Sequence, residues 1–343
     1  MTSRERVLET LAFHPADRLP YDLTDGRIWP ELREYFLLEH GLRSNDEIFD
    51  FLGTDFRWIE VSLTPEAQKA RSADSPRTPT ETADYAAGPL ASARIVDDVH
   101  RLYRPDLLPS ELEMPDFRAF RRRWPDHAVV LLPYATAYFW TTCRLFGMER
   151  ALTTLADAPE VYRALLDKLA VDSHAVLEHF LERSRGFVDV VELWDDVAGQ
   201  AGMLVDPAWW RRVMRPYLAA EVEMVHSVGA RVLFHSCGAV RPILADLVEI
   251  GVDALEVFQV NAAGMEPRSV ARELGGKRGF YGGIDVQHLL SCGTREEVAA
   301  QVRHNAACFR ASGGYVVANC HSHIRTVQGR NIVAMCEAAR ECR

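Results

Sequence analysis

The last third of the chain repeats one pattern four times, a short apolar run followed by a stretch of helical character. Successive runs start about 25 to 35 residues apart, which is the length that a parallel βα unit requires. Four such units in series restrict the chain to an open doubly wound sheet or a closed (β/α)₈ barrel. The four runs are ARVLFHS (230–236), DALEVFQV (253–260), RGFYGGID (278–285) and GYVVANC (314–320).

Earlier parts of the chain supply the remaining strands. Three runs have strand character, and an eighth strand is expected inside DFRWIEVSL (55–63); the three are LPYDL (19–23), HAVVLLP (127–133) and GFVDVVELW (186–194). Eight strands favour the barrel, so we predict an α/β fold with a single TIM-barrel domain over 1–343 and an N-terminal helical extension. The segment 63–90 is rich in Pro, Ser, Thr and Ala, and we expect it to be a surface excursion.

Helix boundary signals agree with this period. Capping boxes at Thr2-x-x-Glu5 and Thr294-x-x-Glu297 predict helices that begin there, the second running to Ser312. Asp206 followed by proline predicts another helix start, with a kink at Pro216. The stretch 149–183 is expected to be one long helical region. An apolar pair at 209–210, Trp-Trp, is expected to be exposed and hints at an interface.

Charge and cysteine content narrow the class of protein. The chain of 343 residues has 39 Lys plus Arg against 49 Asp plus Glu, a formal charge of −10, which disfavours nucleic acid as a partner. The N-terminus has no secretory signal pattern and no stretch is apolar enough to cross a membrane, so we expect a cytoplasmic protein. Seven cysteines at irregular spacing do not make a disulfide framework, so they are expected to be core thiols, metal ligands or nucleophiles.

Two of the apolar runs end in thiols and imidazoles. ARVLF is followed by His235-Ser236-Cys237, and GYVVAN is followed by Cys320-His321-Ser322-His323. Active sites of such barrels lie at the strand C-termini, and catalytic zinc takes three Cys or His ligands with one open position. His235, Cys237 and Cys320 are therefore a candidate zinc site, although buried structural thiols explain the same residues equally well. Cysteines 143, 308, 336 and 342 in helical patterns, and Cys292 in a loop, are expected to be structural.

Charged residues at other strand ends are further candidates. Asp196 follows VVELW, where it can act as general acid or base, orient a ligand imidazole, hold substrate or simply cap a turn. Glu192 lies inside that run, and a buried glutamate usually has a partner or a function. Arg27 follows the first run and suits an anionic ligand group or a solvated loop. Asp285 is expected to cap the next helix.

The sequence resembles the uroporphyrinogen decarboxylase superfamily. The similarity lies in FYGGIDVQHLLSCGTREEVAAQV, GGYVVANCHSHIRTVQGRNIVA, DDVAGQAG (195–202) and PADRLPYDL, and it spans nearly the whole chain. The resemblance implies a single (β/α)₈ barrel whose site lies in a cleft at the C-terminal face.

Two departures separate this chain from the true decarboxylases of that superfamily. Decarboxylases carry Arg-Gln-Ala-Gly-Arg after the first strand, where this chain has Leu23-Thr24-Asp25-Gly26-Arg27 and lacks the first arginine. They also carry Gly-His-Gly near the C-terminus, where this chain reads Cys320-His321-Ser322. Cobalamin-linked methyltransferases of the superfamily instead bind zinc through a His-x-Cys and a later Cys, and the order of His235, Cys237 and Cys320 is similar to that pattern.

The resemblance therefore implies a zinc-dependent methyltransferase that moves a methyl group between a corrinoid and a thiol, folate or methylated substrate. Zinc would be held by the His-Cys-Cys set, with Glu192, Asp196, His323 or the substrate as a fourth ligand. Asp196 and His321 would handle protons or orient substrate, and Arg27 and Tyr281 would contact it. No corrinoid-binding module is fused here, so the corrinoid would be free or on a separate protein. A metal-free decarboxylase and a non-catalytic tetrapyrrole-binding protein are the alternatives, and the oligomeric state is open.

Overall fold

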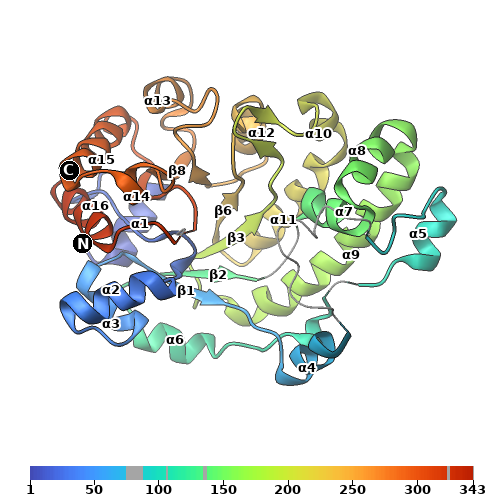
Figure 1. Ribbon diagram of the computed structural model, residues 1–343, viewed down its shortest axis with the longest axis horizontal. Helices are drawn as coiled ribbons and strands as arrows, with labels where there is room; N and C mark the ends of the chain where they lie inside the picture. Colours follow the sequence, from blue (N-terminus) through green and yellow to red (C-terminus); the bar gives the residue numbers. More distant parts are fainter. Residues whose placement is uncertain (75–87, 106, 134–136, 323–324, 343) are drawn as a thin grey trace.

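A parallel sheet forms the centre of the computed structural model, which describes residues 1–74, 88–105, 107–133, 137–322 and 325–342 (Figure 1). Seven strands follow one another in the order β1-β2-β3-β6-β7-β8-β9, every neighbouring pair parallel. A separate small hairpin is formed by β4 (Ala198–Gly199) and β5 (Gly202–Met203). The seven strands are β1 (Phe56–Glu60), β2 (Ala128–Leu132), β3 (Val190–Trp194), β6 (Arg231–His235), β7 (Ala254–Phe258), β8 (Gly279–Ile284) and β9 (Tyr315–Asn319).

The segment around Tyr21 closes the sheet between its two edge strands. Tyr21 forms a parallel bridge with Val317 of β9, whose N–H donates to the Pro20 carbonyl at 3.0 Å. On the other side, the N–H of Asp55 donates to the Tyr21 carbonyl at 3.0 Å, directly before β1. The segment thus occupies the eighth position, and the predicted (β/α)₈ barrel is confirmed.

The segment around Tyr21 pairs over fewer residues than the predicted strand 19–23. Pro20 has no N–H to donate, and a 3₁₀ turn (Thr24–Gly26) begins immediately after the segment. The Tyr21 N–H donates to the side chain of Asp55 at 3.0 Å instead of to a strand carbonyl. Asp55 also accepts from Arg6 at 2.6 Å and from Arg18 at 2.7 and 2.9 Å, and its side chain is fully buried. A charged cluster therefore replaces part of the strand pairing.

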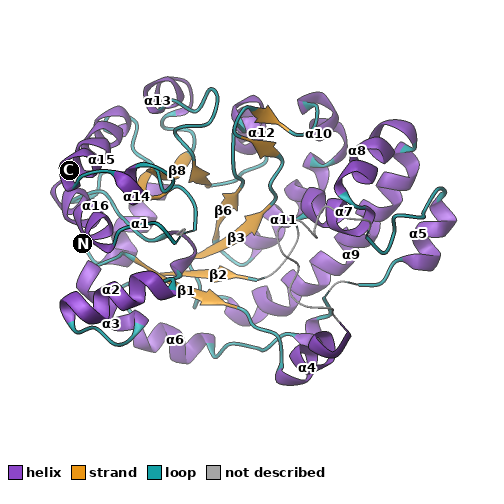
Figure 2. Cartoon of the chain, viewed as in Figure 1, coloured by secondary structure: helices purple, strands orange, loops and turns teal. Residues whose placement is uncertain are grey.

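Helices surround the strands and cover the outer face of the sheet (Figure 2). From β1 onward, each strand of the barrel sheet is followed along the chain by one or more helices, as the βα repeat predicts. The helices are α1 (Ser3–Leu11), α2 (Pro30–His40), α3 (Asn45–Leu52), α4 (Pro65–Asp74), α5 (Val96–Leu102), α6 (Phe117–Arg123), α7 (Tyr138–Phe146), α8 (Met148–Asp157), α9 (Pro159–Ser184), α10 (Pro207–Val213), α11 (Arg215–Ser227), α12 (Leu244–Glu249), α13 (Pro267–Leu274), α14 (Leu289–Cys292), α15 (Arg295–Phe309) and α16 (Gly329–Glu341).

The predicted helix starts are confirmed, and two boundaries are corrected. Both capping boxes are present, and the Asp206 side chain accepts from the N–H of Trp209 at 2.9 Å. The stretch 149–183 is two helices, because Pro159 begins α9 and cannot continue α8. The helix starting at Thr294 ends at Phe309 rather than at 312. The tryptophan pair 209–210 is buried, not exposed, since α10 packs it against the core.

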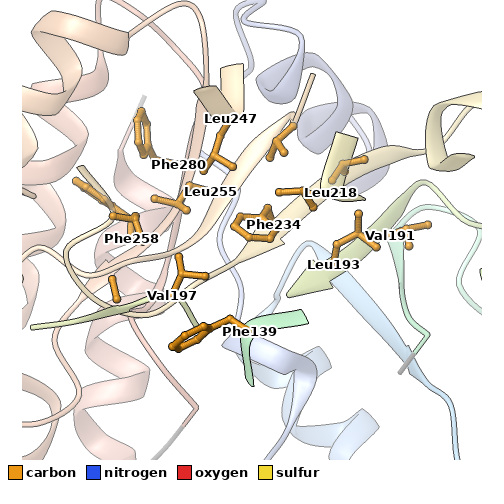
Figure 3. Close-up of a cluster of buried hydrophobic side chains, with 14 of the residues drawn as sticks. Phe139, Val191, Leu193, Val197, Leu218, Phe234, Leu247, Leu255, Phe258 and Phe280 are labelled. Atoms are coloured by element: carbon orange, nitrogen blue, oxygen red, sulfur yellow. The ribbon is translucent and has the colours of Figure 1, made fainter. Parts of the chain in front are cut away.

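Strand side chains alternate between two cores. On β3, Val191 and Leu193 point outward and pack under the helices, together with residues such as Phe234 and Leu255 (Figure 3). Val190 on the same strand points inward to a smaller cluster inside the barrel. The inward row of β3 continues with Glu192 and Trp194, so polar groups replace apolar ones toward the strand's C-terminal end.

The segment 63–90, predicted to be a surface excursion, is described only in part. It contains α4, and residues 75–87 lie outside the described residues. Before α4, Leu63 bridges Leu112 in antiparallel fashion. Among the helices that the structure describes, none is both long and apolar enough to span a bilayer.

Candidate functional site

A cavity of about 220 Å³ opens at the C-terminal ends of the strands. Three of its lining residues follow the inward alternation of β3 and the turn after it, namely Glu192, Trp194 and Asp196. The remaining lining residues come from the first barrel segment, β2, β6 and the turn after β9; they are Asp25, Arg27, Leu132, His235, His321 and Ser322. The cavity therefore combines several carboxyl groups and imidazoles with an apolar wall.

His235 is held in one orientation by a buried glutamate. Its Nδ1 lies 2.7 Å from Oε2 of Glu256, which is fully buried on the adjacent strand β7. A carboxylate accepts only, so Nδ1 donates, and this contact turns Nε2 toward the cavity side. Nε2 faces Cys237 Sγ at 3.7 Å and Asp196 Oδ1 at 3.8 Å. Burial alone would lower the pKa of His235, but the Glu256 carboxylate and the Cys237 thiol outweigh it and raise that pKa.

Cys237 lies in a setting that favours its thiolate. Burial acts against ionisation, but hydrogen bonding with His235 and His321 outweighs it and lowers the thiol pKa below its usual range. The backbone N–H of Cys237 donates to Asp196 Oδ1 at 2.7 Å, which fixes the carboxylate beside the sulfur. Hydrogen bonding to Cys237 raises the pKa of His321 to about 9. His235, Cys237 and Asp196 each offer a ligand atom within 4.8 Å of the others.

Cys320, the third predicted metal ligand, lies next to this group rather than within it. Among the described residues, the sets of ligand atoms within 4.8 Å of one another do not include its sulfur. Cys320 lines a neighbouring cavity of about 120 Å³, and His321 lines both cavities. Burial raises the pKa of the Cys320 thiol to about 12, so without a metal this thiol keeps its proton.

One amide side chain joins the two cysteine loops. Gln259, directly after β7, accepts from the N–H of Gly238 at 2.9 Å and donates to the carbonyl of Cys320 at 3.2 Å. The same Gln259 oxygen accepts from the Gln200 amide at 2.7 Å. The loops that carry Cys237 and Cys320 are thus fixed to a common partner.

The other predicted substrate residues have different surroundings. Arg27 lines the first cavity and pairs with Glu60, with Nε 3.3 Å from Oε2 of that glutamate. Tyr281 is almost fully buried inside the barrel and donates from its hydroxyl to Asp22 at 2.9 Å, so it is not among the lining residues. Asp22 also accepts from the Trp58 indole at 2.7 Å, and burial raises the pKa of Asp22 to about 7.

The remaining candidates are mostly structural. Asp195 points away from the cavity and accepts from the N–H groups of Phe139 and Trp140 at the start of α7, the capping role that was the alternative for its neighbour Asp196. Asp285 accepts from the N–H groups of residues 287–289, as expected for a cap. Cys292 is the last residue of α14 and not in a loop. His323, a candidate fourth ligand, lies outside the described residues.

Sequence reasoning missed Glu256 and Asp25. Asp25, Glu192, His235 and Glu256 form a second set of groups within 4.8 Å of one another. Glu256 interrupts the apolar run DALEVFQV just as Glu192 interrupts VVELW, so the same signal was present in the sequence. Asp25 has a positive φ of 62°, and its carboxylate accepts from the Ser322 hydroxyl. No pattern in the sequence indicated that the turn after the first segment faces the turn after β9.

Together, the fold and the site define a (β/α)₈-barrel protein with a cavity at its C-terminal mouth that is lined by carboxyl groups and imidazoles, with the Cys237 thiol beside two of them. The chain belongs to the uroporphyrinogen decarboxylase family, since the family model described as Uroporphyrinogen decarboxylase (URO-D) matches residues 84–342. No curated protein matches the chain at a significant level.

Two solved structures are similar to the chain at low sequence identity. A methyltransferase from Methanosarcina mazei is 17% identical with a TM-score of 0.67, the alignment covering 99% of both chains. Native xylanase 10B from Thermotoga maritima is 10% identical with a TM-score of 0.42, over 99% of this chain and 98% of that one. The likeness to the Methanosarcina protein shows a shared fold over nearly the full length.

Proposed function

We propose that the chain is a zinc-dependent methyltransferase that moves a methyl group between a corrinoid and a small molecule, either a thiol, a folate or a methylated substrate. The observation that carries the proposal is the grouping of His235, Cys237 and Asp196 ligand atoms within 4.8 Å at the barrel mouth. The family is named for decarboxylation, but the chain shares its fold with a solved methyltransferase. This likeness supports the proposal of methyl transfer.

The donor chemistry of the site suits zinc. Zinc prefers thiolate sulfur and imidazole nitrogen, and ligand histidines commonly donate their second N–H to a carboxylate, as His235 donates to Glu256. One buried oxygen of Glu256 has no hydrogen-bond partner among the described residues, which leaves it free to respond to a nearby cation. We infer that Cys320 joins as third ligand, because Gln259 already connects its loop to the Cys237 loop.

The chain's own residues would prepare a thiol for methyl transfer. When bound, zinc would hold a thiol as thiolate at neutral pH beside the methyl group. Cys237 and Cys320 must lose their protons to bind a metal, and His321 contacts the first and adjoins the second. His321 would therefore hold the proton that Cys237 gives up, as the imidazolium partner of that thiolate, until the proton passes to solvent. Asp196, fixed by the Cys237 N–H, would orient the ligand set.

A wider opening beside the metal ligands suits the corrinoid. A cavity of about 720 Å³ shares Gln200, Asn261, Asp285 and Gln287 with the smaller cavity that reaches Cys320. Its lining is rich in amides, and corrinoid rings carry amide side chains that pair with such groups by hydrogen bonds. The corrinoid would approach on this side, free or on a separate protein.

Decarboxylation of a porphyrinogen is the second candidate, because the family description names it. Such a substrate carries many carboxylates, and the 220 Å³ cavity has Asp25, Glu192 and Asp196 in its lining. Arg27, the lining guanidinium, already pairs with Glu60. Like charges repel across a low-dielectric cavity, so this arrangement opposes a polyanionic substrate.

Zinc content tests the proposed function. The untagged protein is expected to hold about one zinc per chain, and Cys237→Ser to retain less than about a tenth of it, because a hydroxyl is a poor zinc ligand. Elemental mass spectrometry after dialysis measures both, with Cys308→Ser on α15 as a matched control outside the lining of the three cavities. Full zinc in Cys237→Ser, or none in the wild type, would remove the basis for methyl transfer.

A further inference from the structure

Glu192 is a buried carboxyl side chain in the lining of the cavity. It is only 3% exposed, it lines the cavity, and its Oε2 has no hydrogen-bond partner among the described residues. A buried carboxyl group without a partner is costly, and the cost is removed when a ligand supplies a donor or a positive charge. Something that binds in this cavity is therefore expected to satisfy Glu192.

The groups around Glu192 select the charge of that ligand. Asp25 and Glu256 place carboxyl oxygens within 4.8 Å of those of Glu192, and each already has one donor, from Ser322 and His235 respectively. Carboxylates this close repel one another, and two cationic side chains of the lining already have partners, His235 with Glu256 and Arg27 with Glu60. An anion would add to this repulsion, whereas a cation relieves it.

The cavity wall selects the kind of cation. Trp194 lies two residues after Glu192 on the same inward row of β3, and Leu132 of β2 also lines the cavity. Hard metal ions keep several of their water molecules, and an indole and an aliphatic wall offer no hydrogen-bond acceptors to those waters. Methylated ammonium and sulfonium groups bind well beside aromatic rings and carboxylates.

We propose that Glu192 and Trp194 form a subsite for a cationic group, an ammonium or sulfonium, of the small molecule that reacts here. The proposal rests on the proposed function in taking this cavity as the substrate site, and it names the substrate class. A small molecule bound in this way has its charged group on the β3 side of the cavity and the remainder directed toward His235 and His321.

Three ligands of similar shape but different charge distinguish the effect of charge on binding from the effect of shape. Choline is the cation, 3,3-dimethylbutan-1-ol the neutral isostere and 3,3-dimethylbutanoate the anion. We expect calorimetric titration of the zinc-loaded wild type to show choline binding at least about tenfold tighter than the alcohol, and the anion weakest. Equal or tighter binding of the alcohol or the anion, or no binding of choline, would overturn the proposal.

Two variants locate the subsite. Glu192→Gln keeps the shape and removes the charge, so the preference for choline over the alcohol is expected to fall to about threefold or less. Glu34→Gln makes the same charge change on the exposed face of α2 and is expected to retain the full preference. Trp194→Leu is expected to weaken choline but not the alcohol, which keeps the test open if Glu192→Gln fails to fold. An unchanged preference in both site variants would contradict the assignment.

Metal analysis of the same samples distinguishes this inference from the proposed function. Loss of choline selectivity in Glu192→Gln at full zinc content supports the subsite alone. A wild type without zinc that still prefers choline would overturn the zinc-dependent function and leave the subsite standing. Two metal ions per chain, the second lost in Glu192→Gln, would place a metal where we place the cationic group and overturn the inference.

Discussion

Replacing Glu256 by glutamine is expected to weaken zinc binding about ten- to a hundredfold. The wild-type carboxylate accepts from His235 Nδ1 at 2.7 Å and thereby leaves Nε2 free to bind the metal. A glutamine amide presents either an oxygen or an N–H to that nitrogen, so the imidazole loses its fixed tautomer and a strong acceptor. Competition titration of the zinc-loaded protein with a chromophoric chelator measures the change.

Glu192→Gln is the matched control for this prediction. Glu192 and Glu256 are both buried carboxyl groups of the same cluster, but the contact with His235 belongs to Glu256. The control is therefore expected to bind zinc within about threefold of the wild type. Equal losses in the two variants would mean that the charge of the cluster, and not the orientation of His235, governs metal affinity.

Asp55→Ala is expected to lower the free energy of unfolding by about 3 to 5 kcal/mol. Asp55 is fully buried and accepts from Arg6, Arg18 and the N–H of Tyr21. Its removal takes one acceptor from each of two guanidinium groups and the acceptor of the Tyr21 N–H at the point where the barrel closes. Urea unfolding followed by tryptophan fluorescence and far-UV circular dichroism measures the loss.

Asp17→Ala separates this effect from the general loss of an ion pair. Asp17 also pairs with Arg6, at 2.7 Å, but 44% of its side chain is exposed. Exposed pairs contribute little, so this variant is expected to cost less than about 1 kcal/mol. A cost for Asp55→Ala no larger than that for Asp17→Ala would show that the cluster does not hold the barrel closed.

The fold could be predicted where local signals agree. Apolar runs of strand length, each followed by a stretch of helical character, predicted the positions of β6 to β9, and the eighth strand expected in 55–63 is β1. The first segment could not be predicted in the same way. Whether LPYDL pairs along its length depends on Asp55, more than thirty residues away, whose carboxylate replaces a strand acceptor.

The site was predictable in composition but not in arrangement. The ends of β6 and β9 carry the predicted imidazoles and thiols, and the structure brings His235, Cys237, Asp196 and His321 together. The separation of Cys320 from them depends on how the turn after β9 folds. Tyr281 could have been placed by alternation, because its inward position lies below the end of β8, where its hydroxyl reaches Asp22.

The position of His321 has a kinetic consequence. It lines both the 220 Å³ cavity and the 120 Å³ cavity that reaches Cys320, and it is the residue that these two linings share. Reactants that enter from opposite sides of one imidazole do not compete for the same volume. Both can therefore be present in one ternary complex, and an excess of either should not exclude the other.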